Sequence, residues 1–166
     1  MQSFKTFYVL VVIGLAGPKT ASVQAAFGAH GAEGEPNRMR QWLVPSPATD
    51  TAAHALLFRR PGGGPFPLAV IARASTQNVL RRAQMPQPEY RALSARLVAR
   101  GFAVLVPERP GHGATGGRYL EDQGGCDQAD YFRAGRATVD EIAAAARGVG
   151  GRVDFRVLGA SGEEML

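Results

Sequence analysis

The middle of the chain carries the pattern that most restricts its fold, an amphipathic stretch between two apolar runs. Within residues 90–100 the apolar side chains recur at helical spacing, at Tyr90, Leu93, Leu97 and Val98. Gly101 follows where a helix C-cap is expected, and the runs at 67–72 and 102–106 are continuously apolar, as in strands covered on both faces. Because a strand, a helix and a strand at this spacing form a βαβ unit, we expect the two strands to pair in parallel and the helix to pack on them through Leu93 and Leu97. The sequence therefore predicts an α/β fold.

Further elements are predicted on either side of this unit. Short apolar runs at 41–44 and 53–58, separated by proline and other turn-forming residues, predict an antiparallel strand pair. A second helix is expected after residue 130, with one face formed by Tyr131, Val139, Ile142, Ala146 and Val149. The alternating run at 153–158 is expected to be the last strand. Residues 26–39 are small, polar and glycine-rich, so they are predicted to be a flexible lead-in to a domain at 40–166.

Residues 1–25 have the pattern of a secretory signal peptide. Lys5 precedes an apolar run at 7–16 that is too short to span a bilayer, and Val23 and Ala25 occupy the small-residue positions of a cleavage site. The alternative, a buried N-terminal helix, is disfavoured because two glycines and a proline would interrupt it. We therefore expect an exported protein, secreted or periplasmic, with no membrane attachment after the signal is removed.

Charge and cysteine content argue against several classes of site. The formal net charge is +5, but the arginines are scattered, so no nucleic-acid-binding stripe is predicted. Cys126 is the only cysteine, which leaves no internal disulfide and no cysteine pair at metal-ligand spacing. Residues 111–116 fit the Gly-x-Gly-x-x-Gly fingerprint, but prolines separate them from the preceding strand and no helix is predicted to follow at once. We therefore expect neither a nucleotide nor another cofactor, and no metal.

Three motifs, in order along the chain, carry a resemblance to a known family. They are Gly64-Pro65-Phe66-Pro67-Leu68 before the third predicted strand, Pro107-Glu108-Arg109-Pro110-Gly111-His112-Gly113-Ala114-Thr115-Gly116-Gly117 after the fourth, and Gly159-Ala160-Ser161-Gly162 after the last. With this order of elements the chain resembles the α/β-hydrolase family, and within it the secreted dienelactone-hydrolase-like members. The resemblance covers residues 41–166 and implies the N-terminal half of a hydrolase sheet, with antiparallel first strands and then a parallel β-α-β-α-β series.

The resemblance also implies serine-type hydrolysis of a carboxylic ester or related acyl bond in a small-molecule substrate. The family's nucleophile stands on a Gly-x-Ser-x-Gly turn, which assigns that role to Ser161, and the backbone N–H groups of Gly162 and Ser75 are the implied oxyanion donors. Glu163 replaces the last glycine of that turn, and Arg73-Ala74 replaces the His-Gly expected before Ser75. An ordinary turn and a plain surface loop are therefore the alternatives at these two places.

The partners of a serine nucleophile are missing from their expected positions. In this fold the triad acid and histidine follow the serine, whereas His112 precedes Ser161, so we interpret His112 as a structural loop residue or a residue at the pocket rim. No histidine follows Ser161, and Glu163 and Glu164 are too close to it in sequence to serve as the triad acid. We therefore expect a truncated chain with little or no esterase activity. The alternative is a non-catalytic exported fragment or binding protein.

Overall fold

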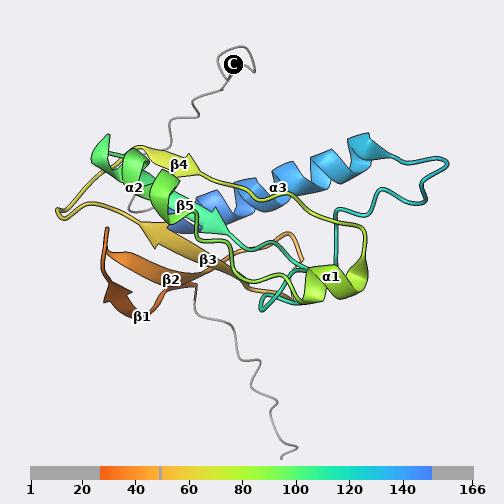
Figure 1. Ribbon diagram of the computed structural model, residues 1–166, viewed down its shortest axis with the longest axis horizontal. Coiled ribbons are helices and arrows are strands. Elements are labelled where there is room, and N and C mark those ends of the chain that lie inside the picture. The colour runs from red at the N-terminus through yellow and green to blue at the C-terminus, as the bar shows by residue number, and fades with distance from the viewer. Residues whose placement is uncertain (1–26, 49, 151–166) are drawn as a thin grey trace, which may run out of the picture.

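A mixed β-sheet with helices on both faces forms the body of the protein (Figure 1), and the computed structural model describes residues 27–48 and 50–150. Its strands, in the spatial order β1-β2-β3-β5-β4, are β1 (Gly28–Gly34), β2 (Met39–Val44), β3 (Ala53–Phe58), β4 (Leu68–Val70) and β5 (Ala103–Pro107). The helices are α1 (Val79–Ala83), α2 (Arg91–Ala99) and α3 (Tyr131–Val149). This arrangement confirms the α/β fold class that the sequence predicts.

The pairing of the strands follows the sequence-based expectations. β2 pairs with β3 in antiparallel fashion, with Trp42 opposite Ala55, and β4 pairs with β5 in parallel, with Ala69 opposite Val104. β3 pairs with β5 in antiparallel fashion, so β5 lies between β3 and β4. The predicted hairpin and the predicted parallel pair of the βαβ unit are both confirmed.

Two apolar layers hold the helices against the sheet. Successive side chains of a strand point to opposite faces, so β3 and β5 contribute to both layers. One layer joins Leu57 and Leu105 to Ala145 and Val149 of α3. The other joins Phe58 and residues of β5 to Val98 of α2. The two helices therefore cover opposite faces, and every residue of β5 is buried between them.

Helix α2 ends as predicted, at a glycine. The N–H of Gly101 donates to the carbonyl of Val98 at 2.9 Å, and the N–H of Phe102 donates to the carbonyl of Leu97 at 3.1 Å. Gly101 has φ +93°, a left-handed conformation that is easiest for glycine. Phe102 and Leu97 also pack together against the same apolar layer. These features form a Schellman C-cap, which turns the chain directly into β5.

The predicted packing face of α2 is partly wrong. Leu93 is 46% exposed, whereas Ser94 and Val98 are buried and Leu97 is half-buried against the core. Ser94 and Val98 lie one turn apart on the same face of the helix. Compared with the predicted face, the helix is turned about its axis so that Ser94, in place of Leu93, faces the sheet. A prediction based only on apolar residues overlooks a small polar side chain of this kind.

The predicted face of α3 needs a similar correction, although its bounds agree with the prediction. Tyr131 and Val139 are 70% and 62% exposed. The buried positions are Glu141, Ala144, Ala145 and Val149, which fall three to four residues apart. The face of α3 that contacts the sheet carries mainly small side chains and one carboxyl group. The larger apolar residues Tyr131 and Val139 therefore do not indicate which face is buried.

Two further expectations are overturned near the edges of the sheet. Residues 26–39 were expected to be a flexible lead-in, but β1 forms within them and pairs with β2. Its side chains are largely exposed, so backbone pairing creates this strand without an apolar signal. β4 was expected to be covered on both faces, yet it is three residues long, pairs within the described sheet only with β5, and is half-buried at Ala69 and Val70. The predicted strand at 153–158 and the turn at 159–162 lie outside the described residues.

Candidate functional site

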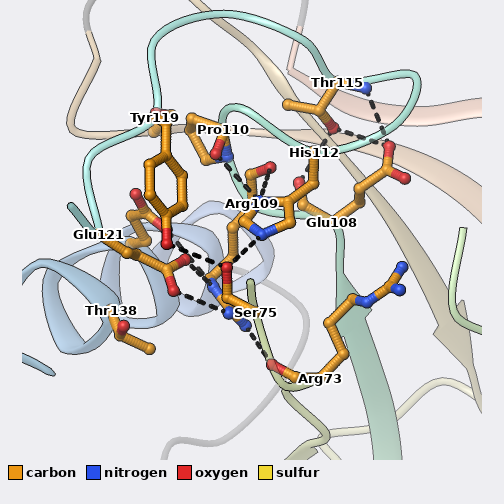
Figure 2. A network of polar contacts seen from close by, with 12 residues as sticks. Arg73, Ser75, Glu108, Arg109, Pro110, His112, Thr115, Tyr119, Glu121 and Thr138 are labelled. Carbon is orange, nitrogen blue, oxygen red and sulfur yellow. Dashed lines mark hydrogen bonds and ion pairs between the residues drawn. The ribbon is translucent and has the colours of Figure 1, made fainter. Parts of the chain in front are cut away.

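Polar side chains gather where β4 and β5 end. Because these strands are parallel neighbours, their carboxyl ends lie at the same edge of the sheet, and the loops that follow them contact each other there (Figure 2). The network, hereafter the polar cluster, comprises Arg73, Ser75, Glu108, Arg109, His112, Thr115, Tyr119, Glu121 and Glu141. Five of these side chains are buried despite being charged or titratable. Buried groups of this kind need partners, and the cluster supplies most of them internally.

A serine and a histidine meet at the centre of the cluster. Ser75 Oγ lies 2.8 Å from His112 Nε2, and His112 is only 1% exposed. The other ring nitrogen, Nδ1, lies 3.1 and 3.2 Å from the carbonyl oxygens of Pro110 and Arg109. A carbonyl can only accept, so we assign the proton to Nδ1, which leaves Nε2 to accept from the Ser75 hydroxyl. Burial lowers the pKa of His112 below its ordinary value, which favours this neutral form.

Tyr119 continues the hydrogen-bond chain from the other side of Ser75. Its hydroxyl lies 3.1 Å from Ser75 Oγ and accepts from Gln77 Nε2 at 2.9 Å. Since the Ser75 proton is directed at His112, the Tyr119 hydroxyl is the donor to Ser75 Oγ. The Arg82 guanidinium lies over the Tyr119 ring, 3.6 Å from its centroid. The Ser75 hydroxyl is therefore held between a neutral imidazole and a fixed phenol.

An arginine shared by two glutamates anchors the same loops to α3. Arg109 donates to Glu121 through both Nε and Nη2, and its Nη1 donates to the carbonyl of Arg73 at 2.9 Å. Glu141, on the buried face of α3, brings Oε2 to 3.5 Å from Arg109 Nε. These three side chains are at most 5% exposed. One guanidinium therefore faces two carboxyl groups in a dry environment.

The shared arginine forces the two carboxyl groups into different states. Burial and the charge of Glu121 raise the pKa of Glu141 to about 9. Burial also opposes ionisation of Glu121, but its hydrogen bonds and charge contact with Arg109 outweigh that effect and hold its pKa below the ordinary value. At neutral pH these three side chains thus comprise one carboxylate on Glu121, one guanidinium on Arg109 and one neutral carboxyl group on Glu141, which avoids an uncompensated buried charge among them.

The loop after β5 folds back on the strand through Glu108 and Thr115. The N–H of Thr115 donates to Glu108 Oε2 at 2.9 Å, and its hydroxyl donates to the Glu108 carbonyl at 2.9 Å. Gly113 closes this turn at φ +40°, and a Cβ there would come within 2.3 Å of both Glu108 Oε1 and the Met85 carbonyl. The glycines of 111–116 thus serve the fold of the loop, and no helix opens at their end.

The predicted site residues have different outcomes. Ser75 lies at the carboxyl end of β4, in the loop expected for an oxyanion donor, but its hydroxyl is bound to His112 and Tyr119. His112, interpreted as a structural loop residue, is buried and hydrogen-bonded on both ring nitrogens. Ser161 and Gly162 lie outside the described residues. The structure therefore brings Ser75 and His112 together, whereas the position of Ser161 relative to them falls outside the described residues.

Sequence reasoning missed the charged half of the cluster. Arg109 is the second residue after an apolar strand, a position where binding and catalytic side chains are common, and this signal could have marked it. Glu141 shares a helical stripe with Ala145 and Val149, and it was missed because the predicted face of this helix shared only Val149 with that stripe. Glu121 and Tyr119 lie in an irregular loop, where no periodicity applies.

Residues 27–48 and 50–150 also bear on two other features, a metal centre and a membrane-spanning helix. Within these ranges no group of three or more His, Cys, Asp or Glu side chains is arranged to hold a metal ion, and Cys126 is an exposed thiol. Nor does any helix there have the length and apolar character needed to cross a membrane. Comparison with known proteins finds no matching family model, no matching curated protein and no matching solved structure.

Proposed function

We propose that this chain is an exported protein of the α/β-hydrolase type, whose family role is serine-type hydrolysis of carboxylic esters or related acyl bonds in small molecules. The observation that carries the proposal is the position of Ser75, at the carboxyl end of a parallel strand and in contact with the loop after the neighbouring strand. Ligands bind to open α/β sheets at this edge. The order of elements, three antiparallel strands followed by β4, the helices α1 and α2, β5 and α3, supports the same proposal.

The roles of individual residues follow the resemblance. Ser161 would attack the acyl carbon, and the N–H groups of Gly162 and Ser75 would bind the oxyanion. The hydrogen bonds of the Ser75 hydroxyl hold its loop in place, which is what a backbone donor requires. In this scheme Ser75 acts through its main chain, while its side chain fixes that main chain.

The proposed activity of these 166 residues by themselves is low. Their three histidines, His30, His54 and His112, all precede Ser161. His112 already accepts from Ser75, and its buried ring is held by two carbonyls. A serine hydroxyl without a neighbouring base is a weak nucleophile, so only the residual rate supplied by oxyanion donors is expected.

The geometry offers a second serine that could react. A serine hydroxyl bonded to a neutral imidazole is the arrangement by which a base activates a nucleophile, and Ser75 and His112 have it. The test is turnover of 4-nitrophenyl butyrate by the purified chain, by Ser161→Ala and by Ser75→Ala. Equal, near-background rates in all three support the weakly catalytic proposal.

Two other outcomes overturn parts of it. Robust turnover that is lost only in Ser161→Ala would contradict the low activity and require a base from elsewhere in the chain. Robust turnover that is lost only in Ser75→Ala would place the reaction at the Ser75 and His112 pair and refute the assignment of Ser161.

A non-catalytic binding protein is the second candidate function. It is favoured by a pocket at the opposite end of the sheet from the polar cluster, lined by arginines and aromatic side chains.

A further inference from the structure

A pocket of about 340 Å³ lies at the end of the sheet where β5 begins. Its lining includes three arginines, Arg38, Arg40 and Arg59, and three large apolar side chains, Trp42, Leu57 and Phe66. The polar cluster lies beyond the other end of β5, so the two places share no side chain. The volume is within the usual range of small-molecule sites, about 300 to 1,000 Å³.

The floor of the pocket is apolar and fixed. Trp42, Leu57 and Phe66 are 7%, 4% and 5% exposed and belong to the core layer beneath α3. Trp42 and Leu57 lie on the paired strands β2 and β3, and Phe66, in the segment before β4, is buried in the same core layer, so close packing fixes all three. The guanidinium of Arg60 lies 5.1 Å from the centre of the Phe66 ring, which adds a further positive charge near this wall.

The rim of the pocket is positively charged. Glu33 is the only carboxylate in the lining, against three guanidinium groups. Glu33 accepts from Arg38 Nε at 2.6 Å and from Arg59 Nη2 at 2.7 Å, and Arg40 Nε donates to the Gly31 carbonyl at 2.8 Å. A guanidinium has five N–H donors, and these contacts engage one N–H of Arg38 and one N–H of Arg40. The rim therefore has a surplus of two positive charges and further donors for a second anion.

We propose that this pocket binds a small carboxylic acid with an aryl or alkyl body. Guanidinium groups match the planar geometry of a carboxylate and bind it through paired hydrogen bonds. Glu33 shows that a carboxylate is bound at this rim, since it accepts one hydrogen bond from each of Arg38 and Arg59. The ligand's carboxylate would take the donors of Arg38 and Arg40, and its hydrocarbon body would cover Trp42 and Phe66.

The chain contains its own reporter for this binding. Trp42 is the only tryptophan in the sequence, and it lines the pocket. The experiment follows Trp42 fluorescence of the full chain during titration with 4-phenylbutyrate, with octanoate, with the neutral amide of 4-phenylbutyrate and with inorganic phosphate. Both acids should give a saturable change, and the amide should bind at least about tenfold more weakly, since it lacks the charge-assisted hydrogen bonds. Phosphate should compete poorly because it lacks the hydrocarbon body.

Variants separate recognition from folding. Arg40→Gln should weaken 4-phenylbutyrate binding by about tenfold or more and leave the weak affinity for the amide unchanged. Arg38→Gln is the second variant, in case loss of the Arg40 contact to β1 disturbs folding. Arg96→Gln, an exposed arginine on α2, is the matched control and should bind as the parent does.

Four results would overturn the proposal. They are the absence of saturable binding by either acid, equal affinity for acid and amide, competition by phosphate as effective as that by the acids, and an equal loss of affinity in Arg96→Gln. None of these results depends on ester hydrolysis, because the pocket contains neither Ser75 nor any other member of the polar cluster. Failure here and failure of the proposed function are therefore distinguishable.

Discussion

Replacing Glu141 by glutamine removes the carboxyl group that shares Arg109 with Glu121. The side chain is 1% exposed, and burial together with the charge of Glu121 raises its pKa to about 9 from an ordinary 4.5. The folded protein therefore keeps a proton on Glu141 at pH values where the unfolded chain releases it. A carboxyl group with a raised folded-state pKa contributes no penalty below pH 4.5 and destabilises the fold progressively as the pH rises toward 9.

The magnitude follows from the width of this pH window. Each pH unit above the ordinary pKa costs about 1.4 kcal/mol, so at pH 7 the native state is less stable by about 3 kcal/mol than it would be with a permanently neutral side chain. Glutamine is such a side chain and has nearly the same shape. Glu141→Gln should therefore match the parent near pH 4.5 and exceed it by up to about 3 kcal/mol at pH 7.

Urea unfolding at several pH values between 4.5 and 8 measures this difference directly. His112 also has a shifted pKa, but its causes do not involve Glu141, so its contribution cancels in the difference between parent and variant. The pKa of Glu121 depends in part on Glu141, so the measured difference reports the two carboxyl groups together. Asp140→Asn, an exposed neighbour on α3, is the control and should show no such trend. A stability difference for Glu141→Gln that stays constant across this range, or that turns unfavourable as the pH rises, would refute the reasoning.

Three further predictions concern packing, the loop after β5 and export. Val98→Ala should lower the free energy of unfolding in urea by about 2 kcal/mol, because Val98 is buried between α2 and the sheet. Leu93→Ala should change it by no more than about half a kcal/mol, and equal costs would mean that a different face of the helix packs on the sheet. Gly113→Ala should lower the free energy of unfolding by about 1 to 3 kcal/mol more than Gly116→Ala, since both glycines have positive φ but only Gly113 lacks room for a Cβ. Equal losses would contradict the close approach of Glu108 and the Met85 carbonyl to Gly113. Mass spectrometry of protein from the native compartment should find a mature chain starting at Ala26, and an intact Met1 would contradict export.

The central fold was predictable because its strands are buried on both sides. The run at 102–106 is apolar throughout and the run at 53–58 is apolar except for His54, and the structure places them as adjacent core strands. β1 escaped prediction because it is held to β2 by a backbone ladder, and its largely exposed side chains carry no apolar pattern. The face of α2 was misjudged for a related reason, since Ser94 is buried without being apolar.

The polar cluster was predictable only in outline. The sequence predicts Ser75 in the loop after the strand at 67–72, and the structure has it in the loop after β4. Its contact with His112 joins positions 37 residues apart, and sequence spacing gives no distance for such a pair. Arg109, Glu121 and Glu141 come from a loop start, a loop interior and a helix. Their partnership depends on how the loop after β5 folds over α3, which local sequence patterns do not determine.

The assignment of the reacting serine is tested most directly by covalent trapping. A fluorophosphonate modifies serine hydroxyls that can act as nucleophiles, and peptide mass spectrometry then identifies the modified residue. For these 166 residues the account predicts slow incorporation at Ser161, because their three histidines all precede it. It predicts none at Ser75, because the Ser75 side chain is assigned the role of fixing its loop through His112 and Tyr119. Rapid stoichiometric labelling, a label on Ser75, or no label on Ser161 after prolonged exposure would contradict it.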